Sequence, residues 1–522
     1  MTATIFATDS AQTLEDFERT AVAVAGVLGE RGVSPGTRVM LKGGNSAGYV
    51  TVLFALMHAG ASIVLVDQQD LAPETTRICR LGSVALAVVD DDASPPDGVP
   101  TIFLYELLAA AVGHVGQPGH VGQPGQVGQP GQPGQPGQRG TGAGLVLDTW
   151  RGLPDGLIMW SSGSTGTPKG VVKTGARFLE NLERNARHMG HRPDDVLLPL
   201  LPFSHQYGLS MVVIAWLVRC SLVIAPYRRL DRAVRMAGQT GATVIDATPA
   251  TWRTLWNMVR RGSASADDIA TVRMLCTGAA PLDPTLVERF VDLVGQPLLD
   301  SYGSTELGNI TFATLDNPVG AGRPVDGIRI GVADDEGTWL PPGELGEILV
   351  DSPDMMEGYL QESGSVEPAE RGWRRTGDLG HLDEGGNLFV RGRKLAVHRM
   401  GHTLYPEVIE SRLAAGGCPV KIVPLPDDRR GSSLVFFVED EAGAEAALWR
   451  ERICAVLPPY ERPNRVVVLD RLPLNRNGKP DRKELIRLAT EATSGPAADA
   501  VVPVDAVVPA QAVSTESTGA GA

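Results

Sequence analysis

The sequence has few cysteines, no long apolar run and no excess of positive charge. Its five cysteines lie far apart, and none of them form the C-x-x-C spacing that is typical of a metal or redox motif. The longest apolar stretch, residues 211–225, is interrupted by Arg219 and is too short to span a bilayer. Residues 1–9 show neither the basic start nor the apolar run of a secretory signal. These absences favour a reduced, cytoplasmic protein with no membrane span.

The charge balance excludes a further class of function. The chain has 522 residues and a formal net charge of −14 at pH 7. General nucleic-acid and anionic-membrane binders draw their affinity from clustered cations, so neither kind of partner is expected here. A chain of this length can bury a large core and form at least two domains.

A glycine- and hydroxyl-rich stretch at residues 161–170 reads SSGSTGTPKG. Apolar residues on both sides predict a strand, a loop and a second extended segment. The glycines allow close approach of the backbone to a ligand, and the hydroxyls and Lys169 add donors, so the composition suits a polyphosphate. The spacing is not that of a Walker A loop, and a flexible surface turn is the structural alternative.

Helical and strand-like segments alternate before residue 320, which predicts an α/β fold with a largely parallel sheet. The predicted helices are 13–32, 49–58, 178–189, 251–261 and 286–294, and the predicted strands are 38–42, 61–67, 196–200, 221–225, 243–246 and 272–276. After residue 320 the pattern changes to short strands separated by turns.

Composition and pattern together predict three parts. These are a large N-terminal domain of stacked, mostly parallel sheets with helices (1–392), a small mobile α+β domain (393–488) and a disordered tail (489–522). Between residues 113 and 140, glycine recurs at every third position, mostly in Gly-Gln-Pro triplets. We interpret this low-complexity segment as an unpacked loop insertion. The alternative, a collagen-like trimerising element, needs three chains in register.

Five further motifs follow the glycine-rich loop. They read PFSHQYG at 202–208, TGAAPL at 277–282, DSYGSTE at 300–306, RTGDL at 375–379 and LNRNGK at 474–479. Taken singly, Tyr302 has the plain interpretation of a core aromatic, Asp378 of a turn residue and Lys479 of an exposed turn lysine. Together and in this order, the six motifs resemble the adenylate-forming superfamily of acyl-CoA synthetases, peptide-synthetase adenylation domains and luciferases. The resemblance runs from about Leu14 to Leu485.

This resemblance implies an ATP site and four catalytic residues. Thr165 and Lys169 would contact the β- and γ-phosphates, and Glu306 would hold Mg²⁺, a hard cation that bridges phosphate oxygens. Lys479 would lie between the substrate carboxylate and the α-phosphate. His205 would lie beside the carboxylate, so the implied catalytic set is Lys479, His205, Glu306 and Thr165.

The remaining implied contacts are to the nucleoside. Tyr302 would stack on adenine, Asp378 would accept hydrogen bonds from the ribose hydroxyls, and Arg393 would also reach the ribose. The full set implied to bind the nucleotide is Ser161, Ser162, Gly163, Ser164, Thr165, Gly166, Lys169, Gly278, Ala279, Ala280, Asp300, Ser301, Tyr302, Gly303, Thr305, Asp378, Arg393 and Lys479.

Two departures from the family pattern bear on function. The hinge motif usually carries an Asp or Lys after G-R-x, whereas Gly392-Arg393-Lys394 is followed by Leu395 and Ala396, and the run to Gly401 is one residue short. This departure concerns thioester formation, the second half-reaction of the family, more than adenylation, the first. Members that activate α-amino acids place an Asp in the segment 203–206, which here holds no acidic residue, and an unpaired buried ammonium is costly.

We therefore expect an AMP-forming ligase that adenylates an aliphatic or aromatic carboxylic acid, not an α-amino acid, and transfers it to CoA. Its cofactors and partners would be ATP, Mg²⁺, the acid and CoA. One alternative is a stand-alone adenylation enzyme that loads the phosphopantetheine of an acyl carrier protein or stops at the adenylate. Another is a catalytically silent nucleotide-binding scaffold.

Overall fold

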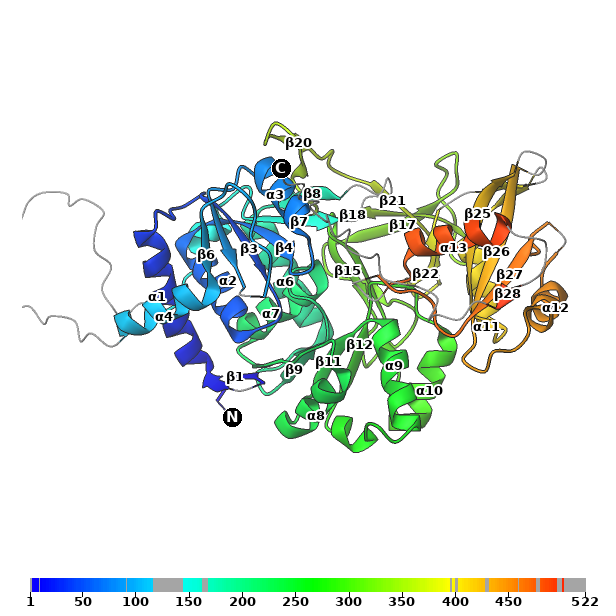
Figure 1. Ribbon diagram of the computed structural model, residues 1–522, viewed down its shortest axis with the longest axis horizontal. Helices are drawn as coiled ribbons and strands as arrows, with labels where there is room; N and C mark the ends of the chain where they lie inside the picture. The colour runs from blue at the N-terminus through cyan, green and yellow to red at the C-terminus, as the bar shows by residue number, and fades with distance from the viewer. Residues whose placement is uncertain are drawn as a thin grey trace, which may run out of the picture. The chain divides into compact units, whose positions relative to one another are not determined.

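The computed structural model describes residues 2–8, 10–90, 92–115, 144–161, 168–394, 397–399, 402–427, 431–458, 460–475, 479–494 and 500–501. The chain forms two compact units (Figure 1), an N-terminal unit of Met1–Leu282 with Leu286–Val390 and a C-terminal unit of Asp283–Thr285 with Arg391–Ala522. The predicted boundary after residue 392 falls within strand β22 (Leu388–Arg393).

The first large sheet of the N-terminal unit has the strand order β20-β19-β8-β7-β4-β3-β5-β6. The neighbours from β7 to β6 are parallel, whereas β7, β8, β19 and β20 pair antiparallel. Its strands are β3 (Arg38–Gly43), β4 (Ser62–Asp67), β5 (Leu86–Val89), β6 (Thr101–Phe103), β7 (Leu157–Ser161), β8 (Lys169–Lys173), β19 (Gly358–Leu360) and β20 (Val366–Pro368).

The second large sheet has the order β13-β12-β11-β9-β10-β1-β2 and is parallel except for the β1–β2 pair. Its strands are β1 (Thr4–Ala7), β2 (Ala11–Thr13), β9 (Val196–Pro199), β10 (Ser221–Ile224), β11 (Val244–Ala247), β12 (Met274–Thr277) and β13 (Leu298–Leu299). Short apolar segments between helices thus form parallel strands, as the alternating pattern predicts.

A central helical layer separates the two large sheets. The layer consists of α1 (Leu14–Glu30), α2 (Ala47–Ala59), α4 (Leu104–Val115), α6 (Gly175–Met189) and α7 (Gln206–Val218), and its apolar side chains form one core with those of both sheets. Strand alternation divides β3 between layers, because Val39 and Leu41 join this core while Met40 packs with Ile78 on the opposite face.

Further helices cover the outer faces of the large sheets. Helix α3 (Ala72–Leu81) packs against the first sheet, and α8 (Leu230–Thr240), α9 (Pro249–Arg260) and α10 (Pro284–Val294) contribute to the core on the outer face of the second sheet. Short helical turns occur at α5 (Asp148–Arg151) and η1 (Ala266–Ile269). This layered arrangement places the carboxyl ends of several parallel strands together.

Antiparallel sheets follow in the later part of the N-terminal unit. One has the order β14-β15-β16 and another β17-β18-β21-β22. Their strands are β14 (Ser301–Ser304), β15 (Gly308–Phe312), β16 (Arg323–Pro324), β17 (Arg329–Ala333), β18 (Gly346–Asp351), β21 (Arg374–Leu382) and β22. These antiparallel sheets therefore begin at β14, before the change in sequence pattern, and continue in the short strands after residue 320.

The C-terminal unit contains a mixed sheet of order β25-β26-β27-β28 and the hairpin β23–β24. Helices α11 and α12 share one core with this sheet, and α13 packs in another. Its elements are β23 (Val397–Arg399), β24 (His402–Leu404), α11 (Pro406–Ala415), β25 (Val420–Asp427), β26 (Gly431–Glu439), α12 (Ala446–Val456), β27 (Arg465–Leu469), α13 (Arg482–Ser494) and β28 (Ala500–Val501).

The α/β prediction is confirmed, and two predicted boundaries are corrected. The predicted tail begins too early, because α13 continues through Ser494 and Ala489 is fully buried with Leu485 and Phe437. Small apolar contacts at helical spacing hold a segment whose composition alone resembles a tail. The predicted loop at 113–140 also begins too early, since α4 extends to Val115. Residues 116–143, with the rest of the repeat, lie outside the described residues.

The described ranges contain no helix that is both long and apolar enough to cross a membrane.

Replacing Ala489 with Asp tests the packing of α13. We expect Ala489→Asp to lower the free energy of unfolding by about 3 kcal/mol, because it buries an unpaired carboxylate among apolar side chains. Thr490→Asp places the same charge on the exposed side of the same helix and should change stability by less than about 1 kcal/mol. Urea denaturation measures both variants, and equal effects would contradict the buried position of Ala489.

Candidate functional site

The glycine-rich loop lies between two paired strands. Strands β7 and β8 are antiparallel, with Ser161 opposite Lys169. Ser162, Gly163, Ser164, Thr165 and Gly166 lie outside the described residues. At Gly170, an added Cβ would lie 3.0 Å from Leu360 Cβ and 3.1 Å from the Trp160 ring, so the close packing of β8 leaves little room for a side chain.

Lys169 and Glu306 meet at the ring of Tyr359. The Lys169 Nζ lies 5.1 Å from the ring centroid, and the Tyr359 hydroxyl donates a hydrogen bond of 3.4 Å to Glu306 Oε1. Burial, reinforced by the Glu306 charge, raises the pKa of Tyr359 to about 12, so the phenol keeps its proton and acts as a donor. The main chain of Glu306 is held by a 2.7 Å hydrogen bond from Met356 N to its carbonyl oxygen.

His205 lies at the start of α7. Its imidazole approaches the carboxylate of Asp67, the last residue of β4 in the first large sheet. Its Nε2 is 3.2 Å from Asp67 Oδ2, and Ser204 Oγ donates to the same oxygen at 3.1 Å. The Asn45 side chain holds the preceding loop by donating to the Leu201 carbonyl at 2.8 Å and accepting from Phe203 N at 2.9 Å. The contact with Asp67 orients the imidazole.

Tyr302 and Asp378, from motifs far apart in the sequence, form a direct hydrogen bond. The Tyr302 hydroxyl on β14 donates to Asp378 Oδ2 on β21 at 2.6 Å. Asp378 N donates to Thr376 Oγ1 at 3.1 Å, which fixes the turn around Gly377. The structure thus brings together two residues that the sequence assigns to one nucleoside site.

The loop at Gly278, Ala279 and Ala280 packs on the strand that carries Ser301. An added Cβ at Gly278 would lie 2.4 Å from Ser301 Oγ, and that hydroxyl donates to the Thr277 carbonyl at 2.7 Å. Ala279 has a φ of 67°, a left-handed conformation that is uncommon outside glycine. Close backbone contact here accounts for the small residues of the motif.

Asp300 immediately precedes that strand. Burial raises the pKa of its carboxyl to about 8, and the 2.9 Å hydrogen bond from Ser301 N partly offsets this effect. Gly303 lies on the adjoining hairpin, where a Cβ would lie 2.7 Å from the Gly308 carbonyl oxygen. Thr305 occupies the turn that leads to Glu306.

The pair formed by Tyr207 and the buried Asp246 was not identified as a unit from the sequence. The Tyr207 hydroxyl donates to Asp246 Oδ1 at 2.9 Å, and Asp246 Oδ2 has no hydrogen-bond partner among the described residues. Burial raises the pKa of Asp246 to about 7, and the bond from Tyr207 partly offsets this effect. Asp246 and the His205 partner Asp67 both lie near the carboxyl ends of parallel strands, where side chains gather over a sheet edge.

Lys479 and Arg393 lie in the C-terminal unit and are both exposed. Lys479 occupies a turn in which its main-chain N–H donates to Asn475 Oδ1 at 3.1 Å and its carbonyl accepts from Asn475 N at 2.6 Å. At Gly392, with a φ of 133°, an added Cβ would lie 2.4 Å from Glu407 Cβ.

The donor set around Glu306 fits a magnesium ion that is shared with a substrate. The described part of the chain holds no group of three or more His, Cys, Asp or Glu side chains arranged to bind a metal. Mg²⁺ characteristically uses one or two protein carboxylates together with phosphates and water, and the partly exposed Glu306 carboxylate, which contacts Tyr359 as Lys169 does, is compatible with that requirement.

Family profiles match most of the chain. The profile of the AMP-binding enzyme family matches residues 1–360, and that of the AMP-binding enzyme C-terminal domain matches residues 420–479. The chain therefore belongs to the AMP-binding enzyme family, and the resemblance to the adenylate-forming superfamily is confirmed.

Individual relatives bear different names. A fatty acid–[acyl-carrier-protein] ligase, ScoC, of Streptomyces coeruleorubidus is 27% identical over 91% of this chain and 91% of its own length. An indoleacetate–CoA ligase of Aromatoleum aromaticum is 32% identical over 65% of this chain and 68% of its own length. The ATP-bound crystal structure of MatB from Rhodopseudomonas palustris has a TM-score of 0.78 at 23% identity, covering 94% of this chain and 97% of that one. This last likeness shows the fold.

Asp246→Asn should change how stability depends on pH. Because the folded-state pKa of Asp246 is raised, the wild-type protein loses stability as pH rises from about 4 to about 7, whereas an amide does not ionise. The free energy of unfolding of the variant should therefore rise relative to that of the wild type by up to about 4 kcal/mol across this window.

Asp195→Asn is the matched control with the opposite sign. Burial alone would raise the pKa of Asp195. Hydrogen bonds from Arg273, Arg192 N and Thr243 outweigh this effect and hold that pKa below its usual range. This substitution should be most destabilising near neutral pH, and its cost should shrink in acid. Denaturant titrations between pH 2 and 8 measure both variants, and a pH-independent effect of Asp246→Asn would contradict the prediction.

Proposed function

We propose that the protein is an ATP- and Mg²⁺-dependent ligase that adenylates a carboxylic acid and transfers the acyl group to the thiol of CoA. The observation that carries this proposal is the convergence of separate motifs within the N-terminal unit. Glu306 and Lys169 meet at Tyr359, and Tyr302 bonds Asp378. Membership of the AMP-binding enzyme family supports the same reaction class.

In the first half-reaction a carboxylate oxygen attacks the α-phosphorus of ATP. A P–O bond forms, the bond to the β-phosphate oxygen breaks, and acyl-AMP and pyrophosphate result. This transfer depends mainly on positioning and on stabilising charge. Lys169, with Thr165 on the adjoining loop, holds the departing phosphates, while Lys479 offsets the repulsion between the carboxylate and the α-phosphate.

Glu306 is the residue proposed to hold Mg²⁺, which when bound neutralises phosphate charge. Tyr359 donates to one oxygen of Glu306 and thereby fixes the orientation of the carboxylate. Asp378 accepts from the ribose, Tyr302 covers the adenine, and the loop at Gly278 to Ala280 borders both the base and the acid. His205, held by Asp67, lies beside the substrate carboxylate.

In the second half-reaction a thiol attacks the acyl carbon of acyl-AMP. The thiol loses its proton, a C–S bond forms and AMP leaves. The relatives are named for both kinds of acceptor, CoA and an acyl carrier protein, so loading of a carrier phosphopantetheine is the alternative function. Arg393 and Lys394 of the altered hinge motif lie in the C-terminal unit, which carries Lys479.

The acid is proposed to lack an α-amine. The segment 203–206 contains no acidic side chain, and the Asp67 carboxylate that reaches it already accepts from Ser204, approaches His205 and accepts from Gln69 N. An additional ammonium group would therefore find no acidic side chain within this segment, and at Asp67 it would compete with these existing contacts.

A pyrophosphate-release screen over aliphatic acids, aromatic acids and α-amino acids tests the reaction. We expect release with a subset of simple acids and none with α-amino acids, and we expect acyl-CoA by mass spectrometry when CoA is present. Release without any acylation of CoA would favour the carrier-protein alternative. Absence of release with every acid would contradict adenylation.

Lys479→Ala tests the catalytic assignment in the C-terminal unit. Pyrophosphate release should fall by about 10²-fold or more, because the charge that offsets anionic repulsion in the transition state is lost, while ATP affinity should change little. Lys483→Ala removes an exposed lysine of α13 and serves as the control. An unchanged rate in Lys479→Ala, measured with the same acid, would contradict the assigned role.

A further inference from the structure

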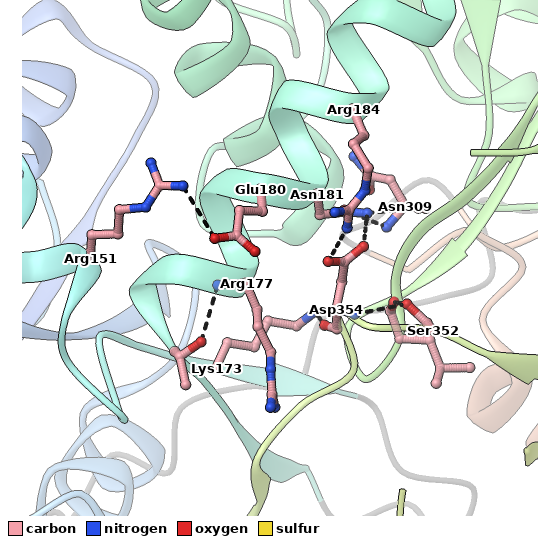
Figure 2. A network of polar contacts seen from close by, with 11 residues as sticks. Arg151, Lys173, Arg177, Glu180, Asn181, Arg184, Asn309, Ser352 and Asp354 are labelled. Atoms are coloured by element: carbon pink, nitrogen blue, oxygen red, sulfur yellow. Dashed lines mark hydrogen bonds and ion pairs between the residues drawn. The ribbon is translucent and has the colours of Figure 1, made fainter. Parts of the chain in front are cut away.

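A cluster of charged side chains, two of them buried, lies where β8, α6 and the loop before β19 meet (Figure 2). It consists of Lys173 at the end of β8, Arg184 on α6, and Asp354 on the loop before β19. Lys173 and Asp354 have relative exposures of 2% and 1%. Charged side chains are seldom buried to this extent without partners, so each contact within the cluster has energetic weight.

Asp354 contacts both cations of this cluster, Arg184 through its carboxylate and Lys173 through its main-chain carbonyl. Its side chain forms an ion pair with Arg184 and accepts a hydrogen bond of 2.8 Å from Asn181 Nδ2. Its main-chain carbonyl accepts from Lys173 Nζ at 3.3 Å, and its N–H donates to Ser352 Oγ at 3.1 Å. With Asp354 ionised, the cluster carries one net positive charge.

The same contacts hold Glu306 from two directions. Asn181 clasps Asn309, just beyond Glu306 in the chain, by donating to its carbonyl at 3.0 Å and accepting from its N–H at 2.9 Å. On the other side, the segment that begins at Asp354 reaches Met356, whose N–H bonds the Glu306 carbonyl. A shift of Asp354 would therefore move both supports of the Glu306 turn.

Lys173 also interacts electrostatically with Glu306. Burial lowers the pKa of Lys173 to about 8, while the charges of Asp354 and Glu306 oppose this effect and that of Arg177 adds to it. Arg177 is itself paired with Glu357, which also pairs with Arg371. At pH 7 Lys173 is therefore mostly charged, and its ammonium adds positive potential at the carboxylate proposed to receive a metal ion.

We propose that Asp354 and Lys173 are positioning residues for Glu306, and that their opposed charges set how tightly Glu306 holds Mg²⁺. This inference rests on the proposed function, in which Glu306 is the magnesium carboxylate. Asp354 offsets the positive charges beside Glu306 and anchors its turn. Lys173 anchors Asp354, and its positive charge weakens the attraction of the Glu306 carboxylate for Mg²⁺.

A cluster that only joins β8 to α6 would change folding stability when altered, but not the response to magnesium. The sign of the magnesium effect separates the two roles. Removing the negative charge at Asp354 should weaken magnesium binding, and removing the positive charge at Lys173 should strengthen it. Removing both charges should restore the original balance, because the pair carries no net charge.

The experiment measures ATP binding by calorimetry at pH 7 over a series of Mg²⁺ concentrations, together with thermal unfolding. We expect Asp354→Asn to raise the Mg²⁺ concentration for half-maximal ATP binding by about 3- to 10-fold, Lys173→Met to lower it by a similar factor, and the double variant to lie close to wild type. Lys173→Met replaces a buried ammonium with an apolar side chain of similar length, which keeps the sign test available if Asp354→Asn folds poorly.

Two controls make the outcomes distinct. Asp351→Asn removes a nearby carboxylate whose partner is the exposed Arg329, and should leave the Mg²⁺ response unchanged. Glu306→Gln should abolish that response; if it does not, the proposed metal role of Glu306 fails and the inference with it. If Glu306→Gln abolishes the response while Lys173→Met and Asp354→Asn change only thermal stability, the inference alone is overturned.

Discussion

The pairing of β8 with a strand on each of its edges is the constraint on which the rest of the site depends. On one edge β7 fixes the start of the glycine-rich loop, and on the other β19 places Tyr359 opposite Val171 and Leu360 opposite Gly170. Lys169 and Lys173 lie at the two ends of this short strand. One extended segment thus connects the loop proposed to bind phosphates with the tyrosine beside Glu306 and with the buried Asp354 cluster.

Much of the fold follows from local pattern. Short apolar segments such as β4 and β9 alternate with helices along the chain, and this alternation predicts parallel pairing without knowledge of the strand order. The order of the strands depends on which of their apolar faces pack together. No local feature of the sequence predicts that β3 packs against a different core on each of its two faces. The end of α13 was missed for a related reason, because alanine and threonine in a mobile tail and in a packed helix look alike until their partners are known.

The candidate site, like the fold, could be predicted only in part from the sequence. Motifs assign Glu306, Asp378 and Lys169 to the proposed site, because the expected chemistry requires particular residue types at fixed spacing. Other contact residues were not predicted. Tyr359 beside Glu306, Asp67 beside His205 and Asp354 in the charged cluster stand in ordinary sequence surroundings and gain their contacts from residues far along the chain. Asp246 is recognisable in the sequence as a lone acidic residue in an apolar strand. Its pairing with Tyr207 is visible only in the folded structure.

The hydrogen bond between Tyr302 and Asp378 bears on how a nucleoside is selected. Because the tyrosine hydroxyl already donates to Asp378 Oδ2, a ribose hydroxyl that binds this oxygen exchanges one hydrogen bond for another. Such an exchange adds little to the total affinity. A sugar without that hydroxyl would leave the tyrosine bond in place at a similar free energy, so this contact by itself would discriminate little between the two sugars.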